Sequence, residues 1–138
     1  MMNNAFYDEL LKDYKEKAEI YEHQYELMGR LLDYNGIIKR FKKKGIFSIY
    51  IYGGGFLGIQ LFKTIRDSDI RICGIIDKFG KLKFDVLNVA VYSMTDFESY
   101  YDDEYIIITP VQFYKEIYED LVNRVDKEKI LFLSEFLY

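Results

Sequence analysis

The stretch IYIYGGGFLG, residues 49–58, constrains the fold more than any other part of the chain. It belongs to a run of β-branched and aromatic side chains over residues 46–52, which is typical of a strand buried on both faces. Three glycines end this run, and apolar residues then recur at helical spacing over residues 56–66. A buried strand that turns through glycine into a helix predicts the first half of a β-α-β unit, whose strands are parallel.

The chain beyond this unit continues the alternation of short apolar runs and helical patterns. Further strands are predicted at residues 70–76, 89–91, 105–109 and 129–133, and further helices at residues 93–101 and 112–124. Because crossovers between parallel strands are right-handed, these helices must cover both faces of the sheet. We therefore predict an α/β fold over residues 46–138, a Rossmann-like parallel sheet of about five strands in the order 3-2-1-4-5.

Residues 1–45 predict a helical segment that precedes this domain. Apolar residues recur at alternating gaps of four and three, which defines a heptad pattern: Tyr7, Leu11, Tyr14, Ala18, Tyr21, Tyr25, Met28 and Leu32. We expect a helix about 40 Å long at 1.5 Å per residue, ended by Asn35-Gly36 and followed by a short helix over residues 37–44. The pattern admits two interpretations: the long helix packs on its own domain, or it joins two copies as a homodimer.

Composition narrows the partners and the setting. A net charge of -4 and a pI near 5.1 argue against nucleic acid, and residues 95–128 hold ten Asp/Glu against three Lys/Arg. No window approaches the roughly 18–20 apolar residues that cross a bilayer, so we expect no membrane insertion. The polar N-terminus lacks a secretory signal, and the single Cys73 forms no internal disulfide. A cytoplasmic location fits these features best.

The glycines after the first predicted strand satisfy the pattern G-x-G-x-x-G in the strand-to-helix context that gives it meaning. Gly53 would allow the tight turn, Gly55 would let the backbone approach a pyrophosphate, and Gly58 would permit close packing of helix on strand. The N–H groups of Phe56 and Leu57 would point at the anion, with the helix dipole behind them. The alternative is a turn that needs glycine and binds nothing.

Two further residues are candidate ligand contacts. Asp77 lies 19 residues after Gly58, at the end of the second predicted strand, where a carboxylate accepts hydrogen bonds from ribose hydroxyls. The neighbouring Lys78 would weaken that preference or favour an extra phosphate. Thr109 ends the fourth predicted strand, beside Pro110 and near the topological switch point of the sheet. The alternatives are structural, since Asp77 can cap a turn and Pro110 can simply end a strand.

Residues suited to catalysis are few. The one histidine, His23, is expected on the solvent side of the long helix, away from the carboxyl edge of the sheet. No cluster has metal-ligand spacing, and the acidic run of residues 102–104 is more typical of a solvated turn, so we expect no metal. No Lys-Ser/Thr follows the glycines, which excludes a Walker loop. The sequence leaves an enzymatic role open but favours a binding module.

These motifs resemble a known group of domains. The segments IYIYGGGFLGIQLFKTIRDSDIRICGIID, YIIIT and KILFLSEFL resemble small bacterial Rossmann-like domains of surface-polysaccharide and sugar-modifying proteins. The N-terminal domain of bacterial sugar O-acyltransferases is similar, and it binds a nucleotide-linked sugar there. Related loops often carry Ala, Met or Ser where this chain has Gly54. The acyltransferase repeat is not present in these 138 residues, so we do not expect acyl transfer.

The resemblance implies a nucleotide-binding module, accessory or regulatory in bacterial surface-polysaccharide or sugar metabolism. Its ligand would be NAD(P) or a nucleotide-sugar, held by Gly53, Gly55, Gly58 and Asp77. Two alternatives remain: a subunit of a nucleotide-sugar epimerase or reductase that takes catalytic groups from a partner chain, and an interaction scaffold whose glycine loop binds nothing.

Overall fold

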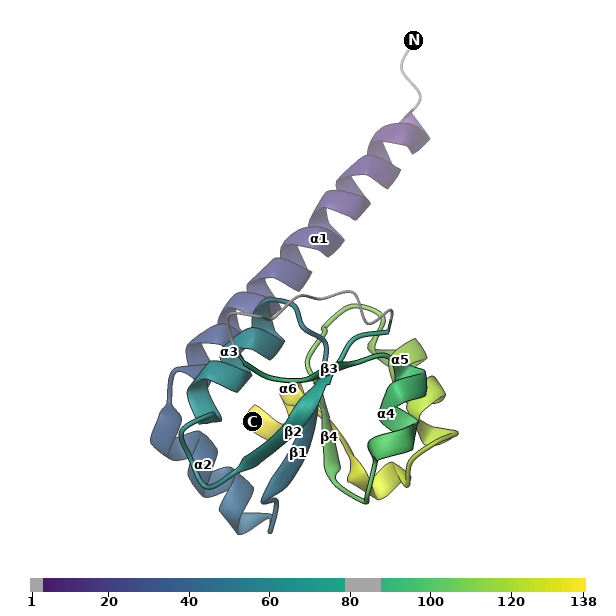
Figure 1. Cartoon of the computed structure of the whole chain (residues 1–138). Helices are drawn as coiled ribbons and strands as arrows, with labels where there is room; N and C mark the ends of the chain where they lie inside the picture. Colours follow the sequence, from purple (N-terminus) through teal and green to yellow (C-terminus); the bar gives the residue numbers. More distant parts are fainter. Residues whose placement is uncertain (1–3, 79–87) are drawn as a thin grey trace.

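The predicted sheet is confirmed in the computed structural model, which describes residues 4–78 and 88–138. Every paired neighbour runs parallel, in the order β3-β2-β1-β4-β5 (Figure 1). The strands are β1 (Ser48–Tyr52), β2 (Arg71–Ile76), β3 (Val91–Tyr92), β4 (Tyr105–Ile108) and β5 (Ile130–Phe132). The third strand lies two residues later than predicted, where Val91 and Tyr92 pair with Ile75 and Ile76 of β2.

Side chains that alternate along β1 divide the core into two layers. Ile49 and Ile51 belong to a cluster on one face of the sheet, and Tyr50 and Tyr52 to a cluster on the other. The first face carries α3 (Phe56–Ile65) and α6 (Leu133–Leu137), and the second carries α4 (Met94–Tyr100) and α5 (Tyr114–Val122). Helices thus cover both faces, as right-handed crossovers require.

The helical segment of residues 1–45 shares the core of the first face. It forms α1 (Asn4–Leu31) and α2 (Tyr34–Lys43), and its buried members join the cluster with α3 and α6: Leu27, Leu31, Ile37 and Phe41. Asn35 and Gly36, predicted to end the long helix, instead lie in the first turn of α2, because Asp33 caps that turn by accepting a hydrogen bond from the Gly36 N–H at 3.2 Å.

Two arginines attach α6 to these helices. The Arg30 side chain of α1 donates to the Leu137 carbonyl at 3.3 Å, and Arg40 of α2 donates to the Phe136 carbonyl at 3.2 Å. Helices leave their last carbonyls without intrahelical donors, so these two contacts satisfy groups that would otherwise need water. The C-terminal residues are therefore held by both charge and packing.

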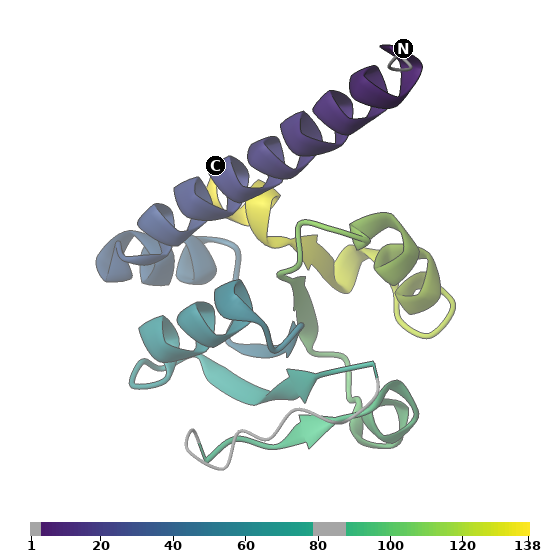
Figure 2. The ribbon, with the colours of Figure 1, turned by 90° about the horizontal axis from the view of Figure 1, so that it is seen from above.

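The heptad residues are not the ones that α1 packs on its own domain. Leu27 and Leu31 are fully buried, whereas most of the heptad residues are exposed and only Met28 packs partly on the core. The N-terminal part of α1 runs past the domain into solvent (Figure 2). Packing on its own domain therefore does not account for the heptad pattern. Within the described ranges, no helix is both long and apolar enough to cross a membrane.

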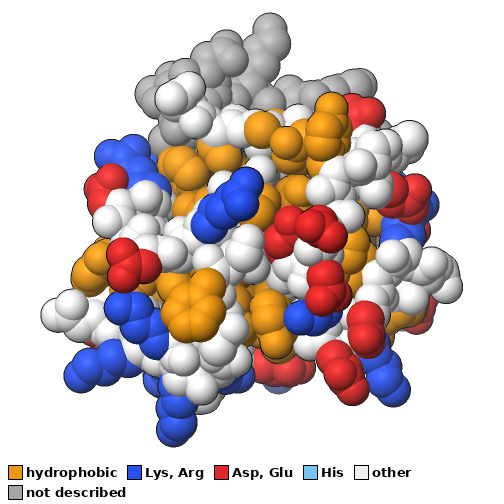
Figure 3. Space-filling model, turned by 60° about the horizontal axis from the view of Figure 1, so that its bottom comes forward, with side chains coloured by type: hydrophobic (Ala, Val, Ile, Leu, Met, Phe, Trp, Pro, Cys, Tyr) orange, Lys and Arg blue, Asp and Glu red, His pale blue; other side chains and the backbone are white. Residues whose placement is uncertain are grey.

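Charge of both signs is distributed over the lower face of the domain. Lys and Arg side chains are interspersed there with Asp and Glu and with apolar groups (Figure 3). The described residues of this face therefore present no continuous basic surface of the kind that binds a nucleic-acid backbone.

Candidate functional site

The turn between β1 and α3 depends on the absence of a side chain at Gly53. Its φ of +99° is disfavoured for L side chains, and its N–H donates to the Ile76 carbonyl at 2.9 Å. A Cβ built there would lie 2.8 Å from the Pro110 ring and 2.8 Å from the Thr109 Oγ1. The fold alone therefore explains a glycine at this position.

Gly58 is required by packing in the same turn. A Cβ at Gly58 would lie 1.8 Å from the Gly53 carbonyl oxygen, a backbone atom that cannot rotate away. The first turn of α3 approaches the end of β1 this closely only because residue 58 lacks a side chain. The predicted packing role of Gly58 agrees with this geometry.

Gly55 differs from both. It is the N-cap of α3, with φ -80° and ψ -162°, a conformation open to other residues, and no side chain caps the helix there. A Cβ added to Gly55 would meet nothing within 4 Å. The space in front of this residue is open, and the N–H groups of the first helical turn have no acceptor within the helix.

Thr109 performs a structural task at the end of β4. It is buried, and its hydroxyl donates to the Tyr52 carbonyl at 2.8 Å, with the Gly53 carbonyl 3.3 Å away. This contact fixes the ends of β1 and β4 together at the switch point, beneath the glycine turn. The hydroxyl proton of Thr109 is therefore directed into the protein.

A cleft of about 850 Å³ opens at the carboxyl edge of the sheet, a size typical of small-ligand sites. It brings together the predicted residues Gly53, Gly55 and Asp77, with Lys78 beside them. The opposite wall is formed by α4, by α5 and by residues that flank α5: Met94, Phe113, Glu116, Ile117, Asp120 and Arg124. The side of the turn that carries Phe56, Leu57 and Thr109 borders a separate cavity of about 200 Å³, which shares Gly55 with the cleft.

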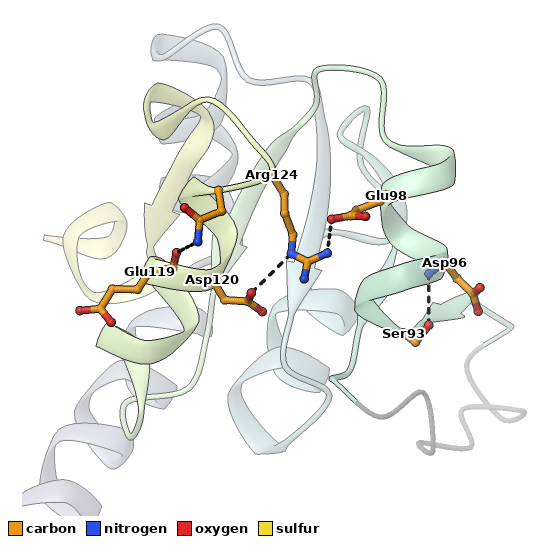
Figure 4. A network of polar contacts seen from close by, with 7 residues as sticks. Ser93, Asp96, Glu98, Glu119, Asp120 and Arg124 are labelled. Carbon is orange, nitrogen blue, oxygen red and sulfur yellow. Dashed lines mark hydrogen bonds and ion pairs between the residues drawn. The ribbon is translucent and has the colours of Figure 1, made fainter.

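Arg124 is held at the wall of this cleft between two helices. Its guanidinium is ion-paired with Glu98 of α4 and lies 3.4 Å from the Asp120 carboxylate of α5 (Figure 4). The hydrogen bond to Glu98 is the main cause that raises the pKa of Arg124. Ser93 begins α4 by accepting a hydrogen bond from the Asp96 N–H at 3.2 Å. The positive charge of Arg124 is thus already largely balanced by these two carboxylates.

The electrostatics of the cleft limit its chemistry. The described residues of its lining include three carboxylates, those of Asp77, Glu116 and Asp120, and the cations of Lys78 and Arg124. Burial, with the charges of Asp120 and Asp77, raises the pKa of Tyr52, so this phenol stays protonated at neutral pH. The described residues contain no group of three His, Cys, Asp or Glu side chains that could hold a metal ion.

The prediction for His23 was wrong. It is half-buried and lines a cavity of about 390 Å³ with Thr109, Pro110 and Leu133, so it lies at the carboxyl edge of the sheet. Its distance in sequence from these residues hides this placement, which follows from the packing of α1 against α3 and α6. The cavity shares Pro110 with the larger cleft.

Sequence reasoning missed two features of the cleft. Arg124 and Glu98 are 26 residues apart, and neither stands in a recognisable motif. Phe113, at the mouth of the cleft, is exposed and has a left-handed backbone with φ +59°, which is unusual for a bulky residue.

Comparison of the chain with models of protein families, with curated proteins and with solved structures gave no match.

Proposed function

We propose that the cleft binds a nucleotide whose diphosphate lies against the N-terminus of α3, as in NAD or a nucleotide-sugar. Gly55 is the observation that carries the proposal. Gly53 and Gly58 are explained by the fold, but no atom of the described protein lies close enough to require glycine at residue 55. A ligand that approaches the backbone there would require it.

The N-terminus of α3 supplies the attraction for phosphate. It has no side-chain cap, so its first N–H groups and the positive end of its dipole face the open space at Gly55. Phe56 and Leu57 would contribute these N–H groups through their backbone, and both residues border the smaller cavity. This arrangement supports the contact that the sequence predicts for a diphosphate.

Asp77 and the other carboxylates select among nucleotides. Asp77 lies in the same cleft at the end of β2, within the part of the site where ribose hydroxyls would lie. Among the described residues that line this cleft, carboxylates outnumber cations, so a ligand with more negative charge than a diphosphate would be repelled. We therefore expect NAD or a uridine diphosphate sugar to bind more tightly than NADP, whose 2′-phosphate would approach Asp77.

The protein would act as a binding module rather than as a self-contained enzyme. The described part of the cleft pairs no nucleophile with a base, and Tyr52 stays protonated at neutral pH. A role in surface-polysaccharide or sugar metabolism stays a prediction that rests on the resemblance of the glycine loop and the strands around it. A catalytic group from a partner chain would turn the same site into half of an enzyme.

Thermal unfolding with NAD(H), NADP(H) and uridine diphosphate sugars tests this function. A ligand at 100 times its Kd stabilises the folded state by about 2.7 kcal/mol, which raises Tm by several degrees. Gly55→Asp should abolish that rise, because the carboxylate caps α3 and repels phosphate. Gly55→Asn, of nearly equal volume and uncharged, should lose less.

The unliganded Tm separates binding from folding. Both variants should equal or exceed the parent chain without ligand, since Asp and Asn are good N-cap residues. Absence of any rise with all ligands at millimolar concentration would refute the proposal and favour the interaction scaffold. An equal rise in the parent chain and in Gly55→Asp would place the ligand elsewhere.

A further inference from the structure

The heptad residues of α1 form an exposed apolar stripe, here called the heptad seam. Tyr14, Tyr21 and Tyr25 are 62 %, 67 % and 82 % exposed. The complete seam consists of Tyr7, Leu11, Tyr14, Ala18, Tyr21, Tyr25, Met28 and Leu32. A stripe of this length with large aromatic side chains is more than the scattered apolar exposure of an ordinary surface.

The domain leaves this seam accessible. At 100° per residue, the centre of the seam lies about 130° around the helix from the side that carries Leu27 and Leu31. These two residues attach α1 to the core. A second helix can therefore lie along the seam while the domain stays in place, and α1 extends beyond the domain to receive it (Figure 2).

We propose that a second copy of this chain docks on the heptad seam, with the two α1 helices antiparallel over their full length. The central layers of the interface would then place Ala18 against the partner's Tyr21 and Tyr14 against the partner's Tyr25. The outer layers would place Leu11 against the partner's Met28 and Tyr7 against the partner's Leu32. The proposal is independent of whether the cleft binds a nucleotide.

Side-chain size selects the antiparallel direction. A parallel pair would set Ala18 against the partner's Ala18 and each tyrosine against the same tyrosine of the partner. The layer of two alanines would then leave a void, and the layers of two tyrosines would be crowded. The antiparallel pair combines the small Ala18 with a tyrosine and sets aliphatic side chains against the terminal tyrosine and leucine. Its layers therefore have more even volumes.

The charges beside the seam are compatible with this direction. Lys15 and Glu22 flank the same edge of the seam, and in the antiparallel pair each Lys15 lies opposite the partner's Glu22, twice by symmetry. In a parallel pair, Lys17 would lie opposite the partner's Glu22, which is also a favourable pair of charges. The charges therefore permit both directions. The choice rests on the apolar layers and on Leu10.

Leu10 supplies a second reason. Leu10 borders the seam on the same side of α1 as Leu31. It lies beyond the end of its own domain, however, and it is exposed. In the antiparallel pair it would lie over the junction between the partner's α1 and its domain, at the level of the partner's Leu31, which is itself fully buried. A parallel pair would leave Leu10 without such a cover.

The area is sufficient for a stable dimer. With about 200 Å² for a tyrosine side chain, the exposed fractions of the four seam tyrosines amount to about 500 Å² per chain, or about 1,000 Å² for two copies. Leu11 and Leu32, also exposed, increase this value. A specific interface needs to exceed about 1,000 Å².

Light scattering of the full chain after size exclusion tests the association. We expect twice the chain mass of 16.6 kDa. Tyr21→Glu should give a monomer with unchanged helical circular dichroism, because it removes the layer with Ala18 and touches no core residue. Tyr100→Glu, at a tyrosine 63 % exposed on α4, is the matched control and should stay dimeric. A monomeric parent chain at high concentration would overturn the proposal.

Disulfide trapping tests the direction, in a Cys73→Ala background that removes the native thiol. The double variant Tyr7→Cys with Leu32→Cys should form covalent dimers on mild oxidation, since these positions face each other across the antiparallel pair. Within one chain they are about 37 Å apart, so they cannot close on each other. Tyr7→Cys alone should stay uncrosslinked, and a covalent dimer of that single variant would overturn the antiparallel arrangement.

Discussion

Alanine at Gly58 should destabilise the fold far more than alanine at Gly55, although both glycines belong to one motif. At Gly58 the new Cβ would lie 1.8 Å from the Gly53 carbonyl oxygen, where ordinary contacts begin at 3.4 Å. The first turn of α3 would have to move more than 1 Å from β1. Overpacking of a rigid site costs 1–3 kcal/mol and sometimes more, so we expect a loss of about 3 kcal/mol or greater.

Gly53→Ala should fall between these two. It combines the strain of φ +99°, about 1–2 kcal/mol, with contacts of 2.8 Å to Pro110 and Thr109, so we expect a loss of about 2–4 kcal/mol. Gly55→Ala meets no atom within 4 Å, and its cost is that of a poorer N-cap, up to about 1 kcal/mol.

Urea unfolding followed by circular dichroism measures these differences as shifts in the midpoint at constant m-value. Gly29→Ala is the matched control, because a Cβ there also meets nothing within 4 Å and alanine favours the helix by up to about 1 kcal/mol. Equal losses at Gly55 and Gly58 would refute the division between a ligand-facing glycine and a structural one. A neutral Gly58→Ala would refute the packing argument itself.

Three further predictions concern the core and the charges. Burial, with a smaller effect of Glu104, raises the pKa of Tyr50 to about 12. The contribution of this phenol to stability is therefore complete below pH 10 and is lost as pH rises through 12. Tyr50→Phe should make the free energy of unfolding less dependent on pH in that window, and an unchanged dependence would contradict this. Leu27→Ala empties a fully buried site where α1 meets the core and should lower the free energy of urea unfolding by about 2–5 kcal/mol, whereas a loss below 1 kcal/mol would show that α1 is not part of the core. Glu98→Gln weakens an exposed ion pair and should change stability little, but it leaves the Arg124 charge less neutralised in the cleft. It should therefore increase the thermal shift caused by a nucleotide, and a smaller shift would show that Arg124 does not face the ligand.

Deletion of the N-terminal helix would not test the dimer cleanly. A cut after residue 33 removes Leu27 and Leu31 from the core together with the heptad seam. Such a deletion could abolish the dimer and unfold the domain at the same time, and the two effects would not be distinguished. Point variants on the exposed side of α1 avoid this, because the seam and the buried side are different sides of the same helix.

The architecture of the sheet was predictable from the sequence because it follows from local patterns and one rule of chirality. Short apolar runs and helical spacings can each be recognised from a few neighbouring residues. The rule that crossovers are right-handed then leaves few possible strand orders. The ends of elements were less predictable. Helix α5 begins at Tyr114 rather than residue 112, because Phe113 has a left-handed backbone conformation. Nothing in the sequence around Phe113 predicts this conformation.

Only part of the candidate site could be predicted from the sequence. The spacing of Gly53, Gly55, Gly58 and Asp77 located the cleft, because each stands beside the carboxyl end of a strand. It did not divide the glycines into two that the fold requires and one that faces open space. That division depends on Pro110, Thr109 and the Gly53 carbonyl, which reach the turn through the pairing of β1 with β4.

The sequence by itself determined the order of elements, the parallel sheet and the presence of a heptad pattern, since these depend on periodicities that neighbouring residues carry. Only the tertiary structure decided which side of α1 is buried, where His23 lies and which helix Arg124 is paired with. Such contacts join segments far apart in the chain, and they depend on the angles and distances at which whole elements pack. No local pattern records those angles.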